Sequence, residues 1–170
     1  ERCQNLPGSN DQKWASDDPK NKGGFIYEPG SSKAGEDKLP DGRTAMRSYG
    51  SISYAGMLSF IYAGLTPDDP RVKAALQWLG ENYTLEENPN MGQQGLYYYY
   101  HTFAKTMSTI GGEEFEDAAG KKHDWKKELT EKLASLQQPN GSWTNPADRW
   151  YEGDPNLVTA YCLIALQNCK

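Results

Sequence analysis

The chain contains no long hydrophobic run, no excess of basic residues and few cysteines. Its longest apolar stretches fall far short of the roughly 20 residues that cross a bilayer, so we predict no transmembrane segment. The 170 residues include 18 basic and 23 acidic side chains, which are interspersed and give a net charge of −5. A nucleic-acid-binding module would show a basic stripe, so we predict no nucleic-acid partner. The three cysteines form an odd set, in which Cys162 lies in an apolar segment and Cys3 and Cys169 can pair only if the chain ends are neighbours.

Phenylalanine is also scarce, and most aromatic residues are tyrosines and tryptophans. Aromatic residues make up 12% of the chain, with 11 Tyr and 5 Trp against 4 Phe. Rings of tyrosine and tryptophan combine an apolar face with a polar edge. Their placement is therefore the main indication of function in this sequence.

The chain divides near residue 43. Residues 1–43 are crowded with Gly, Ser, Asp, Asn, Lys and Pro, and we interpret them as the end of an outer helix followed by a long polar loop. Residues 44–170 carry helical patterns separated by capping signals such as Asp69 before Pro70. The predicted helices are inner 49–65, outer 70–83, inner 91–110, outer 124–138 and inner 155–168.

Inner and outer helices are distinguished by their apolar surface. Segments 70–83 and 124–138 have one apolar stripe and one charged face, which indicates helices with one side in solvent. The other three segments are apolar around most of the helix, which predicts burial on all sides. We therefore predict an all-α fold built as a double layer of α-hairpins, with a simple helical bundle as the alternative. Continuous β-structure is not supported, because no run alternates apolar and polar residues between turn signals.

A short motif marks the junction between an outer and an inner helix. Gln137, Gly141 and Trp143 form Gln-x-x-x-Gly-x-Trp after an amphipathic helix. This arrangement resembles the repeat motif of the squalene-hopene cyclase and protein prenyltransferase superfamily. A divergent copy, interrupted by an inserted loop, consists of Gln4, Gly24 and Phe25. In such a motif the Gln ends an outer helix, the Gly permits a tight turn and the ring packs the turn against the next inner helix.

The resemblance implies an α/α toroid, in which hairpins of inner and outer helices close a ring. The five predicted helices supply only part of that ring. Residues 1–4 resemble the cut end of an outer helix. We therefore predict a partial ring that is completed by the missing hairpins of the same full-length chain or of a partner chain.

The resemblance also implies an aromatic central cavity that holds an isoprenoid chain, where ring faces stabilise carbocations. Four consecutive tyrosines, residues 97–100, open an inner helix and are the best candidate lining. Helical spacing places Tyr97, Tyr100 and His101 on one face, which makes these three the candidate catalytic residues. The alternative is an aromatic core with hydrogen-bonded hydroxyls. The predicted ligand-binding residues are Tyr49, Tyr54, Tyr97, Tyr100, His101, Arg149 and Trp150.

Neither catalytic signature of the superfamily is present. The Asp-x-Asp-Asp motif, with which squalene-type cyclases protonate their substrate, does not occur. Tyr49 and Ser51 stand where prenyltransferases carry the Asp and Cys ligands of zinc, and only His101 resembles the third ligand. The other histidine, His123, lies among charged residues and is predicted to be exposed. We predict no metal and no cofactor.

Three functions stay open at this point. The first is a site for an isoprenoid or another apolar small molecule, with terpenoid chemistry only if missing segments supply an acid. The second is a non-catalytic binding or assembly domain on the same scaffold. The third is polysaccharide-lyase-like chemistry through Tyr and His, in which Arg47 or Arg149 neutralises a uronate. It depends on fold analogy and residue type.

Overall fold

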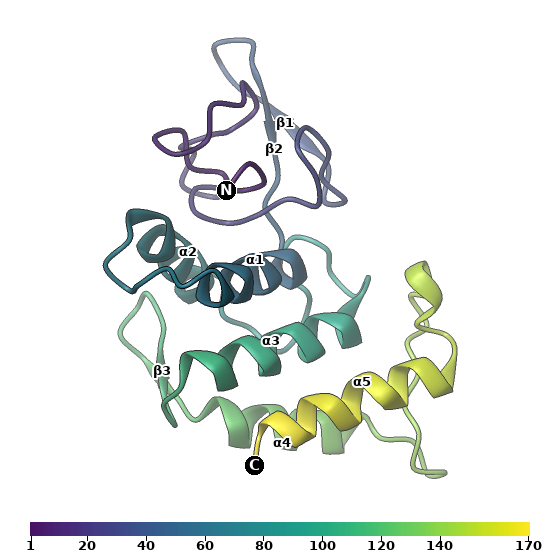
Figure 1. The fold of residues 1–170 in the computed structure, drawn as a ribbon. Helices are drawn as coiled ribbons and strands as arrows, with labels where there is room; N and C mark the ends of the chain where they lie inside the picture. The colour runs from purple at the N-terminus through teal and green to yellow at the C-terminus, as the bar shows by residue number, and fades with distance from the viewer.

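The fold is organised around one central helix. The computed structural model describes residues 1–170. Its helices are α1 Gly50–Tyr62, α2 Pro70–Glu81, α3 Leu96–Ile110, α4 Trp125–Leu136 and α5 Pro155–Asn168. Helix α3 lies between α1 and α5 and contacts both (Figure 1), while α2 packs on α1, and α4 packs on α3 and α5. The N-terminal segment, residues 1–35, precedes β1 and lies above α1 in this view.

Local capping chemistry sets several helix boundaries. Asp69 and Asp154 each accept a hydrogen bond from the backbone N–H two residues later, at 2.9 and 2.8 Å, and each is followed by proline at the first helical position. Helix α3 begins at Leu96 and not at Met91, because Gly95 adopts φ +66° just before it. A left-handed residue of this kind cannot continue a helix.

The predicted all-α fold is wrong. The structure is mixed, 41% helical and 9% strand, with two small antiparallel two-stranded sheets. Strand β1 Glu36–Lys38 pairs with β2 Thr44–Met46, and β3 Phe115–Glu116 pairs with β4 Lys122–His123. Strands of two or three residues are too short to show an alternating pattern, so periodicity does not reveal them.

The N-terminal segment is ordered by buried amide side chains instead of regular structure. Asn5 is fully buried and its Nδ2 atom donates to Met46 O at 2.8 Å and to Ser48 Oγ at 2.9 Å. Asn21 accepts from the backbone N–H of Ser48 at 2.9 Å. The predicted outer-helix end at residues 1–4 forms turns, and Gln4 makes a β-bridge with Phe25. These bonds replace the ladder of a helix or sheet, as buried backbone groups require.

Burial is not distributed among the helices as predicted. Helix α3 carries more buried aromatic residues than any other element, and its Tyr99 and Phe103 are fully buried. Helix α5 was expected to be buried on all sides, but Leu163 and Ile164 are 57% and 44% exposed. The reason is positional, because α5 has α3 and α4 as its helical neighbours and no helix on its remaining side.

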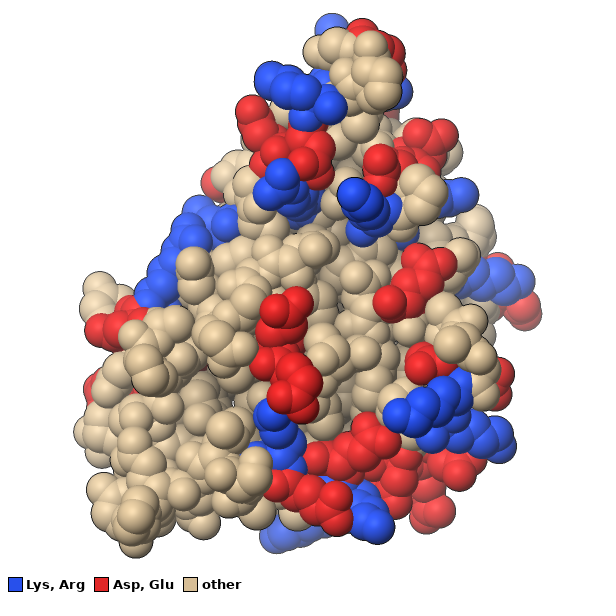
Figure 2. Space-filling model, turned by 180° about the vertical axis from the view of Figure 1, so that it is seen from behind, with Lys and Arg blue, Asp and Glu red and all other residues tan.

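Charge is spread without a dominant sign on the face seen from behind in Figure 2, where acidic and basic side chains are interspersed. The segment 133–147 contains no charged residue and lies at the lower right of Figure 1. Because Figure 2 is seen from behind, this region is at its lower left, where no charged side chain is visible. None of the helices is long and apolar enough to cross a membrane. The chain ends lie at opposite ends of Figure 1, and all three cysteines, including Cys3 and Cys169, are free.

Candidate functional site

Two adjoining hollows lie between the N-terminal segment and the helices. The first, which we call the aromatic cleft, has a volume of about 390 Å³. It is lined by Tyr27, Lys33, Tyr49, Ser51, Ile52, Gly95, Tyr98, Trp150, Glu152 and Tyr161. These residues come from the N-terminal segment, the starts of α1 and α3, the short 3-10 helix η1 Arg149–Tyr151 with the residue after it, and α5. Cavities of this size that combine aromatic walls with a few polar groups are typical ligand sites.

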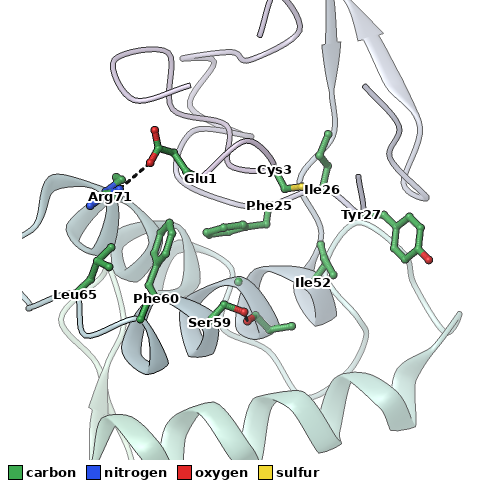
Figure 3. A pocket seen from close by; sticks show the side chains of 13 residues that line it. Glu1, Cys3, Phe25, Ile26, Tyr27, Ile52, Ser59, Phe60, Leu65 and Arg71 are labelled. Atoms are coloured by element: carbon green, nitrogen blue, oxygen red, sulfur yellow. Dashed lines mark hydrogen bonds and ion pairs between the residues drawn. The ribbon is translucent and has the colours of Figure 1, made fainter. Parts of the chain in front are cut away.

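The second hollow, which we call the apolar groove, has a volume of about 480 Å³. Nine of its 13 lining residues are hydrophobic, and they include Phe25, Ile26, Ile52, Phe60 and Leu65. Figure 3 shows Phe25 reaching from the N-terminal segment toward Phe60 of α1, with the ion pair of Arg71 and Glu1 near one end. Tyr27 and Ile52 line both the groove and the cleft. The two hollows are therefore neighbours on one side of the molecule.

The predicted face of Tyr97, Tyr100 and His101 is divided between the core and the surface. Tyr97 and Tyr100 are 4% and 0% exposed, and their ring centroids lie 5.8 Å apart in an edge-to-face contact. The Tyr100 hydroxyl donates to Leu85 O at 2.6 Å, and burial raises the pKa of this phenol. Tyr54, another predicted ligand residue, is also a core side chain. None of these three tyrosines lines the cleft or the groove.

Tyr98 is the member of the tyrosine run that reaches the cleft. It is 39% exposed, and its ring lies 5.8 Å from that of Tyr161 on α5. His101, one turn later, stacks on Tyr161 with ring centroids 5.6 Å apart and planes inclined by 19°. Burial, with a smaller effect of Lys105, lowers the pKa of His101. His101 thus supports the wall of the cleft without lining it.

Glu152 lies at the buried side of the cleft and is 1% exposed. Its carboxylate accepts from the backbone N–H of Tyr98 at 2.8 Å and from Asn145 Nδ2 at 2.7 Å. It therefore serves the free N–H groups at the start of α3, where the helix dipole also favours negative charge. Burial raises the pKa of Glu152 despite these hydrogen bonds, and no lysine or arginine is paired with it.

The loop that carries Trp150 is held in an unusual conformation. Trp150 and Tyr151 have φ values of 65° and 66°, which is the left-handed region that side chains other than glycine rarely adopt. Each such residue costs about 1 kcal/mol or more, and residues of this kind are concentrated at functional sites. A Cβ on Gly95 would lie 3.2 Å from the Trp150 ring, so this glycine allows the indole to pack closely. Arg149, a predicted ligand residue, stacks over Trp150 at 4.3 Å and donates to Gln94 Oε1 at 2.7 Å.

Sequence reasoning thus named some cleft residues and missed others. Of the predicted ligand residues, two line the cleft, Tyr49 and Trp150. Tyr27, Tyr98 and Tyr161 were not predicted. A helical-face argument that placed Tyr98 opposite the fully buried Tyr100 would have found one of them; no signal marks Tyr27 and Tyr161, because their approach depends on tertiary packing.

The motif of Gln137, Gly141 and Trp143 lies away from both hollows and forms the turn after α4. Gln137 Nε2 donates to Gly141 O at 2.9 Å, and Gly141 has φ 85°. Trp143 is 3% exposed; its Nε1 donates to Leu133 O at 2.8 Å, and its backbone N–H donates to Thr159 of α5 at 3.3 Å. This turn therefore connects α4 to α5 through one indole ring.

The divergent copy of the motif, with Gln4, Gly24 and Phe25, holds the N-terminal segment on the helices. Gln4 is 1% exposed, and its Nε2 donates to Gly23 O at 3.0 Å and to Arg71 O at 2.8 Å. A Cβ on Gly24 would lie 2.5 Å from Ser48 Cβ, which shows how closely the backbone approaches the link between β2 and α1. Phe25 lines the apolar groove.

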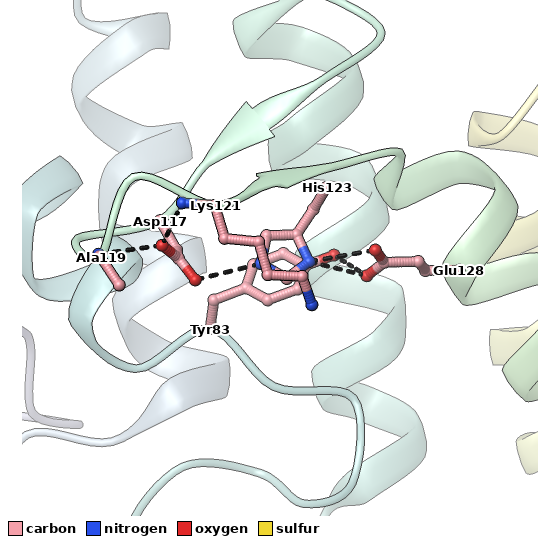
Figure 4. Close-up of polar contacts among 6 residues, drawn as sticks. All are labelled: Tyr83, Asp117, Ala119, Lys121, His123 and Glu128. Atoms are coloured by element: carbon pink, nitrogen blue, oxygen red, sulfur yellow. Dashed lines mark hydrogen bonds and ion pairs between the residues drawn. The ribbon is translucent and has the colours of Figure 1, made fainter.

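A polar cluster surrounds His123 (Figure 4). This histidine was predicted to be exposed, but it is buried, with 6% of its surface exposed. Its Nδ1 lies 3.0 Å from both carboxylate oxygens of Glu128, and its Nε2 lies 3.2 Å from Asp117 Oδ2. The ring lies 3.9 Å from that of Tyr83, whose hydroxyl donates to Glu128 at 2.9 Å. The cluster joins α4 to the β3–β4 hairpin and to the chain after α2.

The structure contains no group of three or more His, Cys, Asp or Glu residues placed to hold a metal ion. No protein-family model, curated protein or solved structure matches this chain. The chemistry of the two hollows therefore supplies the argument for function.

Proposed function

We propose that this chain binds an isoprenoid-type apolar molecule in the apolar groove. The observation that carries this proposal is the hydrophobic lining of a groove of about 480 Å³. Burying an apolar chain there gains roughly 25 cal/mol for each Å² removed from water. The Gln-x-x-x-Gly-x-Trp motif, which resembles that of the squalene cyclase and prenyltransferase superfamily, favours the same ligand class.

The groove offers binding and no evident chemistry. Its charged side chains at one end, Glu1 and Arg71, are paired with each other at 2.8 Å, and Arg71 is also paired with Asp69 at 2.7 Å. Cys3 lines the groove, but burial raises the pKa of its thiol. We therefore place a binding role ahead of a catalytic one, and a longer chain or partner chain would have to add the acid that cyclisation needs.

The placement of side chains gives the lyase-like alternative no support. Tyr100 is buried and bonded to Leu85 O, whereas His101 faces Tyr161. Proton abstraction by a Tyr and His pair needs both groups within reach of one substrate atom.

The test uses farnesol, titrated by calorimetry into the wild type and two matched variants. Ala55→Phe places a ring in the groove, because Ala55 lines it on α1. Ala134→Phe makes the same change on an exposed residue of α4. We expect farnesol binding that Ala55→Phe weakens at least about tenfold and that Ala134→Phe leaves unchanged.

A second readout uses the groove thiol. Bound farnesol is expected to slow alkylation of Cys3 but not of Cys169, which lies outside the groove. No farnesol binding, or binding that Ala55→Phe does not affect, would show that the groove is not the site.

A further inference from the structure

The aromatic cleft gathers several tyrosine hydroxyls that face accessible space. In the core, the hydroxyls of Tyr99 and Tyr100 donate to the carbonyls of Thr84 and Leu85 at 2.7 and 2.6 Å, and the hydroxyl of Tyr54 has no partner. In the cleft, four tyrosine hydroxyls have no hydrogen-bond partner in the protein, and these belong to Tyr27, Tyr49, Tyr98 and Tyr161. Tyr27 and Tyr98 are 53% and 39% exposed, so a ligand that enters from solvent can reach these side chains. The cleft thus presents several unused donors and acceptors together.

Two nitrogen groups of the cleft are unused in the same way. The Lys33 ammonium makes no hydrogen bond or ion pair and lies 4.6 Å from the centroid of the Tyr27 ring. The indole N–H of Trp150 has no acceptor, and neither has the buried one of Trp14, whereas those of Trp78, Trp125 and Trp143 donate to carbonyl oxygens. A ligand with several hydroxyl groups would satisfy these donors.

The charges of the cleft do not favour an ion. Its lining contains one acidic residue, Glu152, and one basic residue, Lys33, so the formal charges of the lining cancel. Such a lining gives neither a cation nor an anion a net attraction. The balance selects a neutral ligand.

We propose that the aromatic cleft binds a neutral saccharide. A pyranose ring has an apolar C–H face that can lie on an aromatic face, and hydroxyls around its edge that bond to polar groups. Tyr98 and Trp150 offer ring surface that is 39% and 41% exposed, and the tyrosine hydroxyls with Lys33 offer the bonds. The volume of about 390 Å³ is within the usual range for small-ligand pockets. This proposal is independent of isoprenoid binding in the apolar groove.

The experiment is saturation-transfer NMR followed by calorimetry with malto-, cello-, manno-, xylo- and chito-hexaose. Tri-galacturonate and tetramethylammonium serve as the charged comparison ligands. We expect at least one neutral oligosaccharide to bind. Trp150→Ala should weaken its binding at least about tenfold, and Tyr98→Phe, which removes only a hydroxyl, should weaken it by a smaller factor.

Tyr151→Ala is the matched control. Tyr151 has the same left-handed conformation as Trp150 but is 80% exposed and does not line the cleft. We expect its saccharide affinity and its unfolding midpoint to equal those of the wild type. Binding of only the charged ligands, binding of none, or equal binding by Trp150→Ala and the wild type would each overturn the proposal.

The saccharide can be free or can be the headgroup of an amphiphile, because Tyr27 and Ile52 border both hollows. An octyl glycoside of the bound sugar distinguishes these sources. An affinity gain that Ala55→Phe abolishes identifies the headgroup of an amphiphile, and equal affinity for both forms identifies a free saccharide. Loss of farnesol binding in Ala55→Phe with retained hexaose binding would show that the two sites operate separately.

Discussion

The imidazole of His123 and the carboxylate of Glu128 face each other at 3.0 Å in a buried position between α4 and the β3–β4 hairpin. The opposite ring nitrogen lies 3.2 Å from Asp117 Oδ2. Each ring nitrogen of His123 therefore faces a carboxylate. These contacts fix the β3–β4 hairpin on the helix that follows it, α4.

Replacing His123 should destabilise this junction. His123→Ala removes both hydrogen bonds and the contact with Tyr83, and leaves Glu128 and Asp117 without the group between them. We expect the free energy of unfolding to fall by about 2 kcal/mol, measured by urea denaturation at pH 7. Lys121→Ala, an exposed neighbour, should change it by less than about 0.5 kcal/mol. Equal values for the two variants would contradict a structural role of the cluster.

The Asp117 carboxylate should contribute stability that depends on pH. Hydrogen bonds from the backbone N–H of Lys121 and then from His123 hold the pKa of Asp117 below its ordinary value of 3.8. A carboxylate with a lowered folded pKa stabilises the fold above the unfolded pKa, and the contribution is lost as pH falls through the folded value. We expect Asp117→Asn to be less stable than the wild type from pH 7 to pH 5, with a difference that shrinks below 3.8. Urea denaturation at each pH measures it, and a difference that grows on acidification would refute the assignment.

Gly24 and Gly8 provide a matched pair for the packing of the N-terminal segment. A Cβ on Gly24 would meet Ser48 Cβ at 2.5 Å and Trp78 Cδ2 at 2.8 Å, whereas one on Gly8 would have no atom within 4 Å. We expect Gly24→Ala to lower the free energy of unfolding by about 1–3 kcal/mol because of overpacking. Gly8→Ala should leave it unchanged or slightly higher. Chemical denaturation of both proteins decides this, and a harmless Gly24→Ala would mean that the segment does not pack so closely.

Two tryptophans should separate stability from binding. Trp143 is 3% exposed and bonded to Leu133 O, whereas Trp150 is 41% exposed at the cleft. Trp143→Ala is expected to lower the free energy of unfolding by about 3–5 kcal/mol. Trp150→Ala should lower it by about 1 kcal/mol or less, and an alanine at that left-handed position keeps its backbone strain. Similar losses for both would indicate that Trp150 is a core residue.

The sequence predicted the positions of the helices more accurately than the fold class. The capping pairs at Asp69 and Asp154 and the apolar periodicity mark where helices form, because these signals act over one or two turns. The short strands escaped prediction, although Asp41-Gly42 is a turn signal between β1 and β2. The inference that an all-apolar helix is buried on every side also failed for α5, since the sequence does not state how many neighbours a helix has.

The candidate site was predictable only in part. Tyr49 and Trp150 were named on sequence grounds, while Tyr27, Tyr161 and Glu152 were not. Tyr27 is far along the chain from Glu152 and Tyr161, and their convergence follows from the packing of the N-terminal segment and α5 around the start of α3. The run of four tyrosines shows the limit of residue type as a guide, because one member faces the cleft while Tyr99 and Tyr100 fill the core.

The sequence by itself determined the helical segments, their caps, the mild and interspersed charge and the abundance of tyrosine and tryptophan, since each of these is a local or compositional property. Tertiary structure alone decided which rings are core and which line a hollow. It also decided that the His123 ring packs on that of Tyr83, which comes from the chain after α2. The physical reason is that burial and hydrogen-bond satisfaction are relations between residues distant in the chain, and no local pattern encodes which partner a side chain meets.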